Sequence, residues 1–60
     1  MINVNSRVVG KAAGVHNVEG VCQEVRLNGN KRKFVIAFNN GIVRECAKRS
    51  VDLLIGIVQL

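Results

Sequence analysis

Several residue types on which particular chemistries depend are rare or missing in this sequence of 60 residues. It contains no proline, tryptophan or tyrosine, and only two phenylalanines, two cysteines and one histidine. A zinc site with four Cys or His ligands cannot form from so few side chains, and Cys22 and Cys46 do not form a Cys-x-x-Cys pair. We therefore expect no metal site and two buried apolar thiols.

Arrangements of residues typical of catalysis are also missing. The single histidine, His16, has no acid or nucleophile at a spacing that indicates a hydrolytic triad. The glutamates Glu19, Glu24 and Glu45 alternate with basic residues, which is typical of solvent-facing strand positions rather than of paired catalytic carboxylates. No glycine-rich loop follows a strand and opens a helix. The sequence predicts a protein that is not an enzyme, with no catalytic residues and no cofactor.

Signals for export or membrane insertion are not visible. The first five residues contain no basic stretch followed by an apolar one, and no apolar run approaches the roughly 20 residues of a membrane helix. We expect a cytoplasmic protein with no membrane partner, in which the cysteines stay reduced.

Basic and apolar residues are what the sequence does contain. Nine Lys and Arg residues against four acidic residues give a net charge of +5, which makes polyanions the natural partners. Apolar residues make up 48% of the chain, too many for a disordered basic tail. We expect residues 1–60 to form one small folded domain, since this length leaves no room for a second core.

Valine and isoleucine occur along the whole sequence, which favours strands over helices. Two Asn-Gly pairs, Asn28-Gly29 and Asn40-Gly41, are expected to form the tight turns of a three-stranded meander. A short amphipathic helix is the alternative for the last predicted strand. The pattern predicts one helical turn over 48–52 and five strands, over 7–12, 18–27, 31–38, 42–47 and 53–60.

The second predicted strand alternates between its two faces. Val21, Val25 and Leu27 are expected on one face. Gly20, Cys22, Glu24 and Arg26 are expected on the other. A glycine inside a strand indicates a bulge or a close approach of another backbone, and we expect one of these at Gly20.

The order of these features resembles that of SH3-like barrels of the Tudor and KOW type. The resemblance covers about residues 6–55 and implies a small, all-β, five-stranded SH3-like barrel with a short helical turn before the last strand. It rests on Arg7-Val8-Val9, Glu19-Gly20-Val21, the segment Val-Ile-Ala-Phe-Asn-Asn-Gly at 35–41, and Val51-Asp52-Leu53-Leu54. Tudor readers of methyl-lysine use a cage of several aromatics, and this chain has only Phe34 and Phe38, both expected in the core. Recognition of histone tails is therefore not expected.

The basic residues carry the leading functional hypothesis, which is a non-catalytic module that binds DNA or RNA through backbone phosphates. Arg26, Lys31, Arg32 and Lys33 flank the first hairpin turn. Lys48 and Arg49 are expected at the opposite end of the fourth strand, with Arg44 between the two groups. The alternative role for these side chains is solvation of strand edges, which guards against aggregation.

The apolar last strand carries a second hypothesis. Its apolar residues occupy both faces, and one barrel cannot bury both faces of an edge strand. We expect Leu54, Val58 and Leu60 at an interface, either with a symmetric copy in a homodimer or with a parent domain. On this reading the protein is an interaction adaptor, such as a phage or accessory factor, that docks on a nucleic-acid enzyme.

Overall fold

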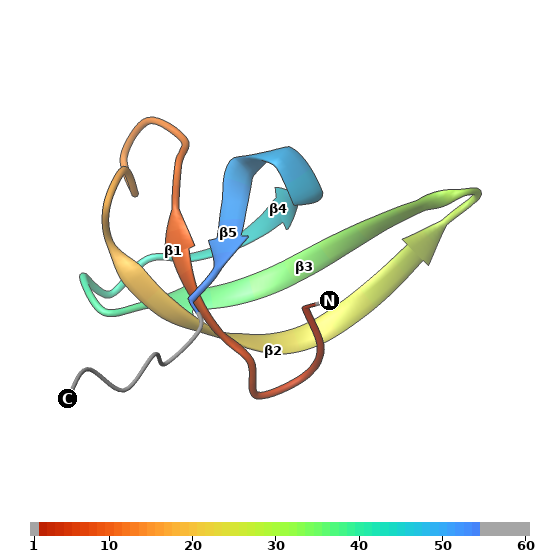
Figure 1. Cartoon of the computed structure of the whole chain (residues 1–60), viewed down its shortest axis with the longest axis horizontal. Coiled ribbons are helices and arrows are strands. Elements are labelled where there is room, and N and C mark those ends of the chain that lie inside the picture. Colours follow the sequence, from red (N-terminus) through yellow and green to blue (C-terminus); the bar gives the residue numbers. More distant parts are fainter. Residues whose placement is uncertain (1, 55–60) are drawn as a thin grey trace, which may run out of the picture.

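The chain folds into one antiparallel sheet (Figure 1). The computed structural model describes residues 2–54. The strands pair in the order β4-β3-β2-β1-β5, and a 3-10 helix, η1 (Lys48–Ser50), lies between β4 and β5. Within the described residues β4 and β5 are not paired with each other, so the sheet is open. The predicted all-β class with five strands is confirmed. The strands are β1 (Arg7–Gly10), β2 (Glu19–Asn28), β3 (Lys31–Phe38), β4 (Val43–Ala47) and β5 (Val51–Leu53).

The end of the described chain differs from its prediction. The helical turn stops at Ser50, and Val51 and Asp52 already pair with β1 as part of β5. Val51 is buried, which explains why this β-branched residue extends the strand instead of the turn. Of the expected interface residues, Leu54 is half-buried and donates its backbone N–H to the Arg7 carbonyl over 2.8 Å. Val58 and Leu60 lie outside the described residues.

The turn between β2 and β3 is one residue later than the Asn-Gly pair indicates. Asn28 still belongs to the ladder, where it faces Lys31, and Gly29 and Asn30 form the loop. Gly29 has a φ of 65°, which suits the first central position of a type II′ turn, where glycine is required.

The turn between β3 and β4 uses the second Asn-Gly pair. The N–H of Gly41, whose φ is 91°, donates to the Phe38 carbonyl over 3.1 Å. The Asn40 side chain accepts a hydrogen bond from the Ile42 N–H (3.2 Å) and donates to the Gly14 carbonyl (3.3 Å). The turn is thereby tied to the loop that follows β1.

A β-bulge divides β2 into two halves whose faces are exchanged. The register with β3 shifts between Cys22 and Glu24, which leaves Gln23 as the extra residue. After it Val25 packs against the core on the same side as Cys22, whereas Arg26 points to the opposite, outer face of the sheet. The predicted division of this strand into two uninterrupted faces is therefore wrong beyond Cys22, because one extra residue reverses a period of two.

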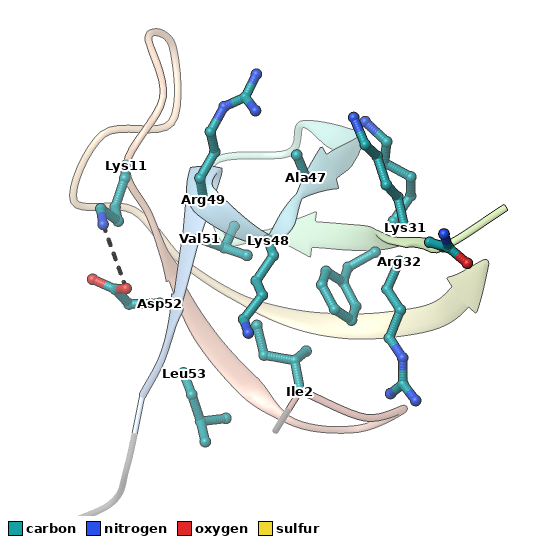
Figure 2. A pocket seen from close by; sticks show the side chains of 13 residues that line it. Ile2, Lys11, Lys31, Arg32, Ala47, Lys48, Arg49, Val51, Asp52 and Leu53 are labelled. Carbon is teal, nitrogen blue, oxygen red and sulfur yellow. Dashed lines mark ion pairs between the residues drawn. The ribbon is translucent and has the colours of Figure 1, made fainter. Parts of the chain in front are cut away.

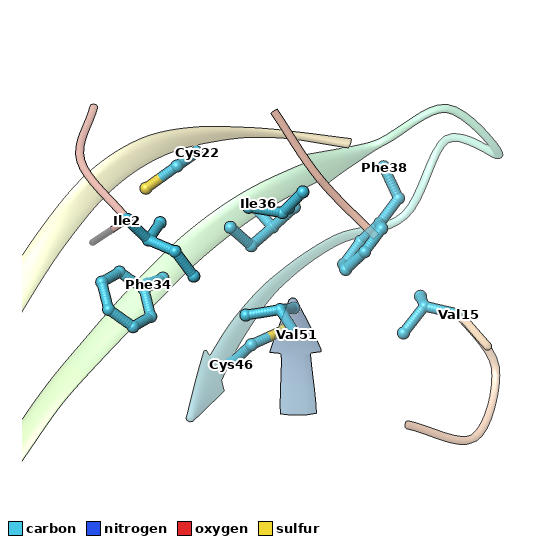
Figure 3. Close-up of a cluster of buried hydrophobic side chains, with 9 residues drawn as sticks. Ile2, Val15, Cys22, Phe34, Ile36, Phe38, Cys46 and Val51 are labelled. Carbon is cyan, nitrogen blue, oxygen red and sulfur yellow. The ribbon is translucent and has the colours of Figure 1, made fainter. Parts of the chain in front are cut away.

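Nine apolar side chains, each at most 6% exposed, form the core. Figure 3 shows those of β2, β3 and β4 facing Val51 from β5 and Val15 from the loop after β1. Cys22 and Cys46 are buried free thiols, as predicted. Gly20 is not the bulge, but a Cβ there would lie 2.8 Å from the Ala37 carbonyl oxygen, so the expected close backbone approach is confirmed. The core residues are Ile2, Val8, Val15, Cys22, Phe34, Ile36, Phe38, Cys46 and Val51.

Candidate nucleic-acid interface

An open groove of about 1040 Å³ lies between the β2–β3 hairpin and the segment formed by η1 and β5 (Figure 2). Because β4 runs back along β3 and Ala47 pairs with Lys33, η1 comes to lie beside the start of β3. On the other side, the N–H of Lys11 donates to the Ser50 carbonyl over 2.8 Å, which brings the end of β1 to η1. We call this the basic groove, after the six Lys and Arg residues that line it: Lys11, Lys31, Arg32, Lys33, Lys48 and Arg49.

The floor of the basic groove is apolar. It includes Ile2, Phe34 and Val51, whose side chains are 6%, 2% and 2% exposed and therefore present little surface. Phe38, the other phenylalanine, is 4% exposed and lies in the core. With no tryptophan or tyrosine in the chain, no aromatic ring is available on which a base could stack. The groove therefore offers charge and hydrogen-bond donors rather than a stacking platform.

The four acidic side chains are all engaged in ion pairs, and only one of these acids lines the groove. These pairs place the four acids against three cations, Arg7, Lys11 and Arg26. Five other Lys and Arg residues line the basic groove, and its one acidic residue, Asp52, is held by Lys11. The ion pairs are Arg7 with Glu19 (3.4 Å), Lys11 with Asp52 (3.6 Å), and Arg26 with both Glu24 and Glu45 (3.1 Å each).

Two of the basic residues expected at the site do not reach the groove. Arg26 lies on the outer face of the sheet, where hydrogen bonds from its guanidinium to Glu24 and then to Glu45 raise its pKa. Arg44 extends to the loop after β1 and donates to the Ala13 carbonyl over 2.9 Å. Arg26 is thus neutralised by its neighbours, and Arg44 has a structural role in holding that loop against β4.

The other five expected residues all line the groove, although they were expected as two separate groups. Along β3, Lys31 and Lys33 alternate with Arg32 and leave the strand on the face that Lys33 shares with Arg26. Lys31, Arg32 and Lys33 belong to the start of β3, and Lys48 and Arg49 belong to η1. Lys11 was missed, because nothing near it in the sequence distinguishes it from other exposed lysines. Only the pairing of β1 with β5 places it beside η1.

Two particular features are absent from residues 2–54, a metal-binding cluster and a membrane-spanning helix. No group of three or more His, Cys, Asp or Glu side chains there could hold a metal ion. No helix in this part of the chain has the length and apolar character needed to cross a membrane. Burial raises the pKa values of the Cys22 and Cys46 thiols above the ordinary value of 9.0, so both are neutral and poorly nucleophilic at neutral pH.

No family model matches this chain, and neither a curated protein nor a solved structure gives a significant match. The basic groove is thus the feature from which its function can be inferred.

Proposed function

We propose that this protein is a non-catalytic nucleic-acid-binding module that holds one strand of DNA or RNA in the basic groove by its phosphates. The separation of charge is the observation that carries the proposal. All four acids are held in ion pairs with Arg7, Lys11 and Arg26, and five other basic residues line one open groove. The five proposed phosphate contacts are Lys31, Arg32, Lys33, Lys48 and Arg49.

The shape of the groove supports contact with a backbone rather than with an isolated anion. Its two walls come from different elements, and in Figure 2 the side chains of Lys48 and Arg32 lie on either side of Ile2. A strand running between the walls would meet cations on both sides. Long, flexible Lys and Arg side chains supply affinity to phosphates without reading sequence.

The strand order and the 3-10 helix before β5 support a relationship to SH3-like barrels, which we propose as the fold family. The free thiols of Cys22 and Cys46 fit the reducing cytoplasm expected for the protein.

The test is a comparison of two double variants that remove the same charge from different places. Lys48→Gln/Arg49→Gln removes two phosphate contacts from the groove. Arg7→Gln/Arg26→Gln removes two cations from the outer ion pairs. Binding of a fluorescent 20-base-pair DNA duplex, the matching RNA duplex and a single strand is followed by anisotropy at 0.1 M salt.

Loss of two contacts should weaken duplex binding about 60-fold at 0.1 M salt. Each contact raises the logarithm of the association constant by about 0.9 when the salt concentration falls tenfold from about 1 M to 0.1 M. The outer double variant should bind nearly as well as the unaltered protein. Equal weakening by the two variants would show that binding depends on net charge alone. Absence of binding to all three ligands would refute the proposed function.

A further inference from the structure

The hairpin between β2 and β3 extends beyond the strands that flank it. The ladder with β1 ends at Val21, and the ladder with β4 ends at Lys33. The β2–β3 ladder continues to the pair of Asn28 and Lys31. Residues 27–32, which we call the arm, therefore form a two-stranded ribbon without a third strand in the described chain, and all six are exposed. Figure 1 shows the arm projecting from the rest of the sheet.

The arm is also one wall of the basic groove. Asn30, Lys31 and Arg32 line the groove from this side, and Lys48 and Arg49 line it from the other. A strand whose phosphates lie in the groove would run alongside the arm. In a duplex the space beside a strand is the major or the minor groove, so the arm would occupy one of them.

We propose that the arm enters the major groove of B-form DNA, an inference that rests on the proposed function and names its ligand. Two paired strands are about 4.8 Å apart, and their side chains project from the two faces of the ribbon. The major groove of B-DNA is about 12 Å wide and admits a two-stranded ribbon, whereas the minor groove is about 6 Å wide. The major groove of A-form RNA is too deep and narrow for side chains to read. The ligand is therefore duplex DNA.

The side chains of the arm suit the edges of base pairs. Asn28 and Asn30 carry amides of the kind that form two hydrogen bonds with adenine. Leu27 is 73% exposed, and an apolar group at this position can contact a thymine methyl group. Gly29 forms the tip of the arm with a φ of 65°, a conformation that glycine adopts without strain. The arm thus adds sequence preference to phosphate contacts that have none.

The experiment compares DNA and RNA duplexes of the same sequence at the same salt concentration. The DNA duplex should be bound at least tenfold more tightly. Methyl green, which occupies the major groove, should displace the protein, and distamycin, which occupies the minor groove, should not. Asn28→Ala/Asn30→Ala leaves the charge unchanged and should lower the affinity for a preferred DNA site about tenfold without altering binding to RNA. The matched control is Asn39→Ala, an exposed asparagine in the other turn.

Two results would overturn the proposal while leaving the proposed function intact. One is equal affinity for the DNA and RNA duplexes. The other is displacement by distamycin but not by methyl green. Failure to bind any nucleic acid would instead remove the proposed function itself.

Discussion

The affinity of the protein for duplex DNA should fall steeply as salt is added, because every phosphate contact releases condensed counterions. Five basic residues are assigned to phosphates, three on β3 and two on η1. At about 0.9 per contact, the logarithm of the association constant should fall with the logarithm of the salt concentration with a slope of about −4.5. Between 50 and 200 mM KCl this corresponds to a loss of about 500-fold.

The variant Lys48→Gln/Arg49→Gln keeps three contacts. Its slope should be about −2.7, and the same change in salt should weaken its binding only about 40-fold. The outer variant Arg7→Gln/Arg26→Gln has the same net charge but keeps all five contacts, so its slope should stay near −4.5. The measurement is an anisotropy titration of a 20-base-pair duplex at four salt concentrations, with circular dichroism to verify that each variant is folded.

The comparison of slopes separates a defined site from diffuse attraction. Attraction to the whole molecule depends on net charge and would lower the slopes of both variants equally. A slope near −1 for the unaltered protein would leave room for a single phosphate contact and would contradict the assignment of five. Equal slopes of the two variants would show that the basic groove is not where a nucleic acid binds.

Two further predictions concern the core. Gly20→Ala should lower the free energy of unfolding by about 1–3 kcal/mol, because the added Cβ meets the Ala37 carbonyl oxygen, and unchanged urea denaturation would contradict the close approach of β2 and β3. Since burial raises the folded-state pKa values of Cys22 and Cys46 above 9.0, stability should be constant below pH 9 and fall as the pH rises beyond it. Denaturation between pH 7 and pH 10 tests this, and an equal fall in a Cys22→Ala/Cys46→Ala variant would assign it to other groups.

Local patterns in the sequence were enough to place most of the sheet. The strand over 31–38 has the predicted bounds, because alternating Phe34, Ile36 and Phe38 lie between two turns that glycine makes possible. The shorter first strand and the early start of β5 could not be read locally. Both depend on the pairing of β1 with β5, two segments that are about 40 residues apart in the sequence.

The sequence also predicts only part of the basic groove, because some of its residues are brought together by pairing between distant strands. Charges around the first hairpin are neighbours in sequence, so Lys31, Arg32 and Lys33 were recognised as a group. η1 lies beside these residues because β4 pairs with β3. Lys11 lies beside η1 because β1 pairs with β5, which is distant in the sequence. Arg26 flanks the same turn, but the sequence does not show that Glu45 from β4 comes to lie beside it and, with Glu24, neutralises its charge.

The bulge at Gln23 adds one residue to β2 without changing which side chains face β3 beyond it, so its deletion should leave the two faces of β2 as they are. Without Gln23, Glu24 would follow Cys22 directly and still face Val35, so Val25 would stay opposite Phe34 and Arg26 would stay on the outer face. The salt slope should therefore remain at about −4.5 in the deletion variant and in the control Gln23→Ala, which keeps the bulge. A slope of about −5.4 after deletion would mean a sixth contact from Arg26, and it would show that the bulge keeps Arg26 away from the groove.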